Sequence, residues 1–178
     1  MVAPAFTSET ELLLDQAAAF CLSRSQRLTE QRRQILGLIL ESPRPSGAYD
    51  LLDRLRQDGK PAAPPTVYRA LDFLTAQGLV HRIERLSAFI GCAHMLAAEG
   101  HEGCDHSHPH HGIEAVQFLI CTQCRRAFEI TDGRIRGAIE AAAAGAGFRP
   151  AAATVEVEGI CADCAAATAE NQTQPALS

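Results

Sequence analysis

The sequence contains no tryptophan, and aromatic residues make up only 5% of it, so its core must consist mainly of leucine, isoleucine, valine and alanine. It also lacks an apolar run long enough to span a bilayer, and residues 1–8 have neither the basic start nor the hydrophobic stretch of a signal peptide. With 178 residues and 47% hydrophobic content, it is expected to be a compact cytoplasmic protein of one domain or two small ones, with no membrane partner.

Two features common in enzymes are missing as well. The sequence has no glycine-rich loop of the kind that cradles phosphates. It also has no pairing of a nucleophile with a general base outside the candidate metal ligands. We therefore expect neither an enzyme nor a small-molecule substrate.

Charge is unevenly distributed along the chain, whose net charge is −5. Residues 24–85 contain 11 Lys and Arg against 7 Asp and Glu, a balance of +4, whereas residues 96–178 contain 5 against 11, a balance of −6. The first half is therefore the part suited to a nucleic acid. All seven histidines lie between His81 and His111, which marks a separate segment.

The first half has the apolar periodicity of successive helices. The S-x-x-E pattern of Ser8–Glu11 is typical of a capping box and predicts where the first helix begins. Thr29 and Ser46 are expected to cap the second and third helices, and the third should cover residues 48–57.

A fourth helix is expected to begin at Pro64 and to end at Gly78. Its inner face would carry Val67, Ala70, Leu71 and Leu74. Strands at residues 79–84 and 88–92 would form a hairpin after it. Because helices followed by a β-hairpin are the order of a winged helix-turn-helix domain, residues 1–92 are expected to form one and to bind DNA.

In such a domain the fourth helix enters the major groove, with Tyr68 and Arg69 facing outward near its amino end. Arg69 suits a guanine edge or a phosphate, and Tyr68 suits a phosphate or a thymine methyl group. Arg32, Arg33 and Arg82 are candidates for further phosphate contacts. The alternative is that these side chains only coat a solvated surface, but the helix order and the charge favour double-stranded DNA.

Residues 93–114 are polar and rich in histidine, and we expect them to form a hinge. A solvated linker is the simplest interpretation of most of its histidines. Cys104, His106 and His108 are nevertheless candidates for a weak third metal site.

Two CxxC motifs follow the hinge, with 36 residues between them. They are formed by Cys121, Cys124, Cys161 and Cys164. Two such motifs supply four soft ligands in a tetrahedron, the arrangement that Zn²⁺ prefers, so a structural zinc site is expected. Disulfides or a redox centre are the alternatives, but nothing indicates an oxidising compartment, and a redox centre would not need a matching second motif.

The second half has the pattern of a small α/β domain over residues 115–165, which makes the whole chain α+β. Its helix is expected at residues 133–144, and its strands at residues 115–120, 126–130 and 154–158. An exposed sheet edge would favour a homodimer. Residues 166–178 are expected to form a disordered tail.

Three motifs together resemble the ferric uptake regulator family of metal-sensing bacterial repressors. They are Arg27–Arg32, Pro64–Leu71, and Phe118–Cys124 with Cys161–Cys164, and the resemblance runs from about residue 10 to 165. It implies a homodimer that binds palindromic, AT-rich operators.

Within that family the sequence is most similar to the zinc-sensing members, which hold a second, regulatory zinc ion at the hinge. The resemblance places its ligands at His81, Cys92, His111 and Glu129. His111 is chosen because it is nearest the first CxxC motif; the hinge is longer than the family pattern, so His110, His108 and His94 are alternatives. A thiolate among the ligands suits zinc better than iron or manganese.

The resemblance therefore implies a repressor of zinc-uptake genes with two zinc ions per chain, which zinc starvation releases from DNA. Zinc would act by selecting the arrangement of the two domains that fits DNA. One alternative is a regulator of the same family that senses iron, nickel or peroxide. Another is a zinc-storage or zinc-transfer protein that uses the histidine-rich segment.

Overall fold

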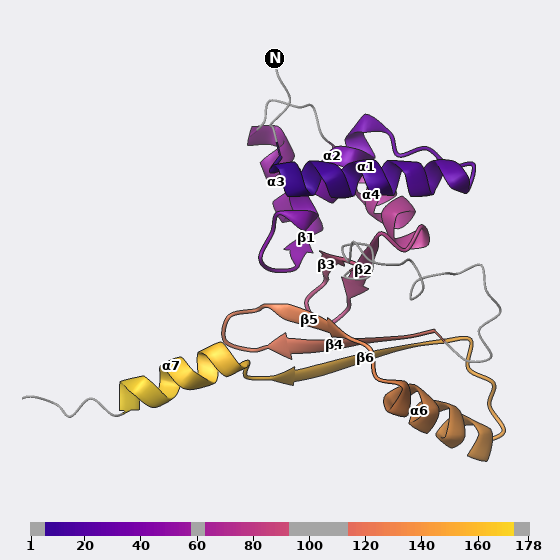
Figure 1. The fold of residues 1–178 in the computed structure, drawn as a ribbon, viewed down its shortest axis with the longest axis vertical. Helices are drawn as coiled ribbons and strands as arrows, with labels where there is room; N and C mark the ends of the chain where they lie inside the picture. The colour runs from indigo at the N-terminus through magenta and orange to yellow at the C-terminus, as the bar shows by residue number, and fades with distance from the viewer. Residues whose placement is uncertain (1–5, 58–62, 93–113, 173–178) are drawn as a thin grey trace, which may run out of the picture. The chain divides into compact units, whose positions relative to one another are not determined.

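The computed structural model of the protein describes residues 6–57, 63–92 and 114–172 (Figure 1). The chain divides into two compact units, residues 1–108 and 109–178. Within the described ranges no helix is both long enough and apolar enough to cross a membrane. The predicted hinge, apart from Glu114, lies outside these ranges.

The first unit is a helical bundle followed by a small sheet. Its helices are α1 (Ser8–Ser23), α2 (Glu30–Leu40), α3 (Ala48–Gln57) and α4 (Pro64–Ala76). Its strands are β1 (Ser46–Gly47), β2 (Val80–Ile83) and β3 (Ala88–Gly91), in the order β1-β3-β2, with both pairs antiparallel. This arrangement confirms the predicted winged helix-turn-helix.

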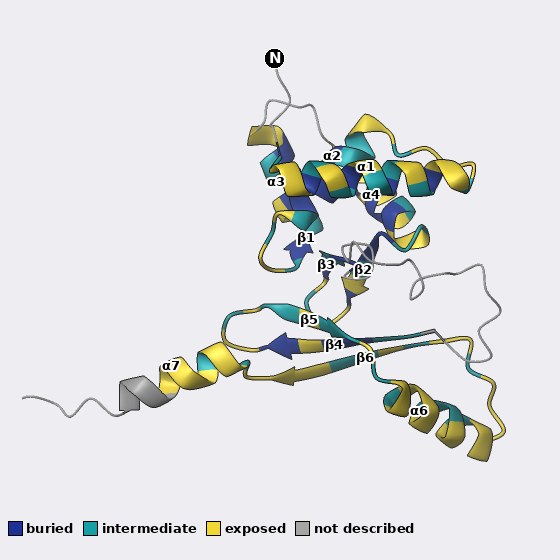
Figure 2. Cartoon of the chain, viewed as in Figure 1, coloured by how far each residue is buried: buried dark blue, intermediate teal, exposed yellow. Residues whose placement is uncertain are grey.

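The core of this unit lies where the four helices face one another (Figure 2). All four residues predicted for the inner face of α4 are buried: Val67, Ala70, Leu71 and Leu74. Gly78 has a φ of 69°, the left-handed conformation that ends a helix and favours glycine. The inner face and both ends of α4 therefore agree with the prediction.

Two predicted caps differ from the structure. The N-cap of α1 is Thr7 rather than Ser8, because the Thr7 hydroxyl accepts a hydrogen bond from the Thr10 amide at 3.3 Å. Ser46 lies in β1, opposite Phe89, a strand that was not expected. The Gly47 amide instead donates to Asp50 Oδ2 at the start of α3, at 3.2 Å.

The second unit is a mixed three-stranded sheet with two helices. Its elements are β4 (Glu114–Cys121), β5 (Ala127–Ile130), α6 (Gly133–Gly145), β6 (Ala152–Gly159) and α7 (Ala162–Gln172). The central strand β4 is antiparallel to β5 and parallel to β6. Asp132 caps α6, as one of the two predicted alternatives, by accepting from the Arg134 amide at 2.8 Å.

Helix α7 was not predicted, and it runs through Gln172 where a disordered tail was expected from residue 166. Its described side chains are largely exposed, so the segment has none of the apolar periodicity that indicates a packed helix (Figure 2). Alanine-rich composition favours a helix without requiring burial. The tail prediction is therefore wrong for residues 166–172, and residues 173–178 lie outside the described ranges.

Candidate metal centres and DNA-contact helix

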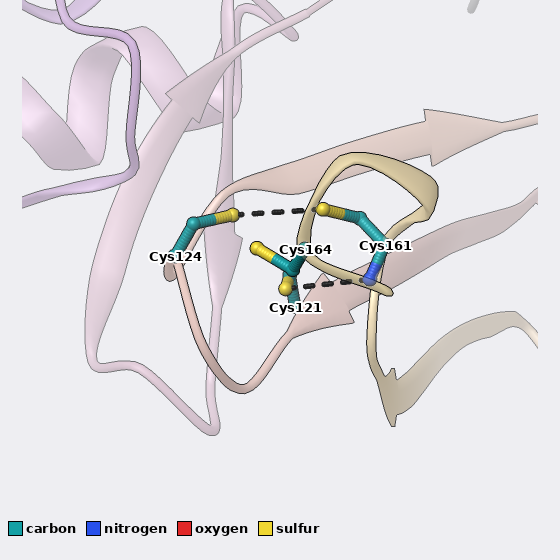
Figure 3. A group of neighbouring side chains, drawn as sticks. All are labelled: Cys121, Cys124, Cys161 and Cys164. Carbon is teal, nitrogen blue, oxygen red and sulfur yellow. Dashed lines mark hydrogen bonds between the residues drawn. The ribbon is translucent and has the colours of Figure 1, made fainter. Parts of the chain in front are cut away.

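The two CxxC motifs meet at one end of the second sheet. Cys121 is the last residue of β4, and Cys161 follows β6 and precedes α7. Because β4 and β6 are parallel neighbours with Cys121 opposite Gly159, the residues that follow both strands leave the same edge. Figure 3 shows the four side chains turned toward one another, and their sulfur atoms all lie within 4.8 Å of each other.

Backbone contacts hold the two motifs together. The Cys161 amide donates to Cys121 Sγ at 3.4 Å, and the sulfur atoms of Cys124 and Cys161 are 3.8 Å apart (Figure 3). The amide and hydroxyl of Thr122 both donate to the Gly159 carbonyl, at 2.8 Å and 3.1 Å. The first motif is therefore fixed to the end of β6 by groups that are not themselves metal ligands.

The sulfur positions fit a tetrahedral zinc ion. A Zn–S bond of about 2.3 Å in a tetrahedron places neighbouring sulfur atoms about 3.8 Å apart. The separation of Cys124 and Cys161 has this value, and all four residues are free cysteines, which excludes the predicted alternative of disulfides within this structure. Four thiols at this spacing form a donor set suited to zinc.

The thiols of this cluster do not ionise equally. The pKa of Cys121 is lowered to about 6, chiefly because the Cys161 amide donates to its sulfur. The pKa of Cys124 is also lowered, first by the Arg126 amide. The pKa of Cys164 is raised to about 12, first by its hydrogen bond with Cys161. A metal ion that binds all four must displace the remaining protons, so binding weakens in acid.

A second pair of metal-binding side chains lies on the wing of the first unit. His81 is on β2 opposite Ile90, and Cys92 directly follows β3, with its amide donating to the Leu79 carbonyl at 3.1 Å. Their nearest ligand atoms are within 4.8 Å of each other. Cys92 is fully buried and His81 is half-buried. A thiol beside an imidazole is a donor pair suited to zinc.

The other predicted regulatory ligands belong to the second half of the chain or to the hinge. Glu129 is half-buried on β5, opposite Phe118 of β4. The hinge candidates lie outside the described residues: His94, Cys104, His106, His108, His110 and His111. Their assignments stay predictions.

The outer face of α4 carries the two residues predicted to read DNA. Tyr68 and Arg69 are exposed in the first turns of the helix, on the side opposite its buried leucines. Arg82 is exposed on β2, where it forms an ion pair with Glu84 at 3.1 Å. These three side chains are accessible within the first unit, and their contacts with DNA stay predictions.

The side chains of Arg32 and Arg33 contact other residues of the first unit, and the sequence did not indicate these contacts. Arg33 on α2 forms ion pairs with Glu11 and Asp15 of α1, at 2.5 Å and 2.8 Å. The Arg32 guanidinium carbon lies 3.5 Å from the centre of the Phe73 ring on α4, and its Nη1 donates to the Arg27 carbonyl at 2.8 Å. Both arginines therefore hold α2 against a neighbouring helix, whether or not they also contact phosphates.

An apolar row crosses one face of the second sheet. Leu119 on β4 is opposite Phe128 on β5 and Val157 on β6, so all three side chains lie on one face. They remain 42%, 41% and 49% exposed, respectively. Together with Ile160 they line a groove of about 510 Å³. This exposed apolar row is therefore a candidate interaction surface.

A winged helix with an outward-facing arginine and a cluster of four thiols defines the class of metal-responsive DNA-binding regulators. The sequence matches the ferric uptake regulator family over residues 23–158. The chain therefore belongs to that family, as its motifs indicated. This family consists of transcriptional regulators rather than enzymes, as the sequence predicted.

Among its relatives is the zinc uptake regulation protein of Escherichia coli, 36% identical over 155 residues that cover 87% of this chain and 82% of that protein. The solved structure of holo XcZur is 40% identical, with a TM-score of 0.70, and covers 88% of this chain and 99% of that one. A zinc uptake regulator complexed with zinc and DNA has a TM-score of 0.77 at 34% identity and covers 90% and 97% of the two chains.

Proposed function

We propose that the protein is a zinc-responsive repressor that binds operator DNA as a homodimer and represses zinc-uptake genes. The observation that carries the proposal is the thiol and imidazole pair of His81 and Cys92, placed on the hairpin that directly follows the DNA-contact helix. A metal ion held there is a few residues from the element that reads DNA. The similarity to zinc uptake regulation proteins supports zinc as that metal.

In this proposal each chain holds two zinc ions, with different roles. The structural ion is held by Cys121, Cys124, Cys161 and Cys164. The regulatory ion is held by His81, Cys92, Glu129 and His111, with His110, His108 or His94 as alternatives to His111. When bound, the regulatory ion joins ligands from the two halves of the chain and so restricts their relative motion.

The dimer reads DNA through two copies of α4. Tyr68 and Arg69 contact base edges or phosphates, and Arg82 on the wing contacts the backbone. A two-fold dimer explains a palindromic operator, because its two reading helices must fit successive turns of one DNA face. The family resemblance implies that this operator is AT-rich.

One titration tests the whole proposal. DNA binding is measured by gel shift over a series of buffered free zinc concentrations, together with zinc content per chain. We expect tight binding only when zinc is present, at two ions per chain. If iron, nickel or peroxide restores DNA binding and zinc does not, the protein is a regulator of the same family that senses a different signal. Binding of several zinc ions without any effect on DNA would indicate storage or transfer.

Arg69→Ala is expected to weaken operator binding about 5- to 150-fold for each lost base contact, the equivalent of about 1–3 kcal/mol, and a homodimer loses two such contacts. Zinc stoichiometry should stay unchanged, because Arg69 is exposed and is not a metal ligand in the proposal. Gel shifts and metal analysis measure the two quantities. Arg56→Ala, on the exposed end of α3, is the matched control and should bind the operator as wild type does. No loss of binding in Arg69→Ala, or an equal loss in both variants, would contradict the placement of α4 in the major groove.

Substitutions of Arg32 and Arg82 should have different effects on the salt dependence of DNA binding. Loss of one phosphate contact lowers the slope of log affinity against log salt by about 1, so Arg82→Ala, which removes one contact from each chain of the dimer, should lower it by about 2. Arg32→Ala should weaken binding and lower the thermal stability while leaving the slope unchanged, because Arg32 stacks on Phe73. A reduced slope for Arg32→Ala would make it a phosphate contact as first predicted.

Leu119→Glu is expected to convert the dimer to a monomer. Leu119 is the central member of the exposed apolar row, and in a two-fold interface the substitution places two carboxylates at once. We expect the dimer dissociation constant to rise more than about 100-fold, since like charges at an interface cost several kcal/mol. Analytical ultracentrifugation measures it. Phe148→Glu, which lies outside the row and is exposed, should remain dimeric.

A further inference from the structure

An ion pair connects the two CxxC motifs independently of their cysteines. Arg126 lies two residues after Cys124, and Asp163 lies between Cys161 and Cys164. The Arg126 guanidinium pairs with the Asp163 carboxylate across 37 positions of sequence. No zinc ligand is used in this contact, so it requires a separate explanation.

The same arginine also interacts with the thiols. The pKa of its guanidinium is raised, first by Cys124 and then by Asp163 and Cys161, so it lies beside one thiol of each motif as well as the carboxylate. Its backbone amide in turn lowers the pKa of Cys124. The guanidinium carbon lies 5.6 Å from the centre of the Phe128 ring, which limits its movement on another side.

The charge of the cluster gives this arrangement a consequence. Four thiolates around one divalent cation leave a net charge of about −2. A guanidinium beside two of those sulfur atoms partly neutralises this charge, and a hydrogen bond between ionised groups is about twice as strong as a neutral one. Asp163 then orients the guanidinium toward the sulfur atoms.

We propose that Arg126 and Asp163 are positioning residues that hold the two CxxC motifs together and slow the loss of zinc from them. The proposal rests on the four-cysteine zinc site and not on DNA binding. Contacts outside the ligands themselves commonly change metal affinity 10- to 100-fold. Arg126 acts directly on the sulfur atoms, and Asp163 acts through Arg126.

The test measures the rate at which the full-length, zinc-loaded protein releases zinc to an excess of chelator. The slow phase is assigned to the four-cysteine site by its absence in Cys164→Ser. Arg126→Ala should accelerate this phase about 10- to 100-fold. Asp163→Asn should accelerate it about 2- to 5-fold, since it removes only an exposed ion pair. Arg126→Lys, which keeps the charge but not the planar fork, should fall between wild type and Arg126→Ala.

Two further measurements separate this role from simple packing. Raising the salt concentration should bring the release rates of wild type and Arg126→Ala closer together, because the exposed charges are screened; a packing role would not respond in this way. Arg136→Ala, an exposed arginine on α6, should release zinc at the wild-type rate.

The proposal is overturned if Arg126→Ala releases zinc at the wild-type rate, or if Arg136→Ala accelerates release equally. If Arg126→Ala does not fold, Asp163→Asn and Arg126→Lys decide the question, and wild-type release from both overturns it. If wild type shows no slow phase that depends on Cys164, the four-cysteine zinc site itself is contradicted. That result differs from the one that would contradict the role of the ion pair.

Discussion

Cys121→Ser should unfold the second unit and abolish the dimer. Cys121 is buried at the end of β4, and its sulfur accepts the amide that fixes the second motif to the first. A structural zinc site is worth about 10–16 kcal/mol in small zinc-binding peptides at pH 7, comparable to the about 5–15 kcal/mol that stabilises a whole domain. Helix α6 contributes no buried residue, so the remaining core of this unit cannot compensate.

Circular dichroism, size-exclusion chromatography and metal analysis measure this loss together. Zinc content should fall by at least one ion per chain, because unfolding of this unit also displaces Glu129, and the protein should elute as an expanded monomer. Cys21→Ala is the matched control, because Cys21 is a buried cysteine of the first unit that takes no part in the cluster. A Cys121→Ser protein that keeps its dimer and its zinc would contradict the structural role of the cluster.

Cys92→Ser is the second substitution with a large expected effect, and it should leave a folded dimer that no longer responds to zinc. In wild type we expect zinc to change operator affinity about 5- to 150-fold, the usual range of allosteric coupling. In the variant this ratio should fall to about 1, since a serine hydroxyl is a poor ligand for zinc. Burial of the hydroxyl at a fully buried position should lower the unfolding free energy by about 1–3 kcal/mol.

Gel shifts at high and low buffered zinc give the ratio, and thermal melts give the stability. Cys21→Ser is the matched control: it also buries a hydroxyl in the first unit, but it should keep the zinc response. Unchanged zinc dependence in Cys92→Ser would show that the regulatory site lies elsewhere. If both variants lose the zinc response, the cause is lower stability of the first unit and not the loss of a zinc ligand.

The elements defined by periodicity and by proline or glycine could be predicted well. Helix α4 begins at Pro64, buries the expected stripe and is followed by Gly78 in a left-handed conformation. Such signals are local, so one sequence is enough to read them. The short strand β1 could not be predicted, because it exists only through its pairing with β3, more than 40 residues away. The cap at Thr7 is itself a local contact with the Thr10 amide, but the S-x-x-E pattern that begins one residue later indicated Ser8 instead.

The candidate sites divide in the same way. The spacing of the four cysteines predicted their convergence, since two residues between thiols are themselves a local signal. The roles of His81 and Cys92 came from family resemblance, and the structure adds only that the two lie close together. The ion pairs of Arg33 and Arg126 join residues far apart in sequence, and no local pattern contains them.

The parallel pairing of β4 with β6 has a consequence for the newly made protein. The second CxxC motif follows β6, and β6 can join β4 only after α6 has been synthesised between them. The chain must therefore be synthesised through Cys164 before four thiols can surround one ion. Copies terminated before Cys161 would supply only two of the four thiols and so could not complete this zinc site.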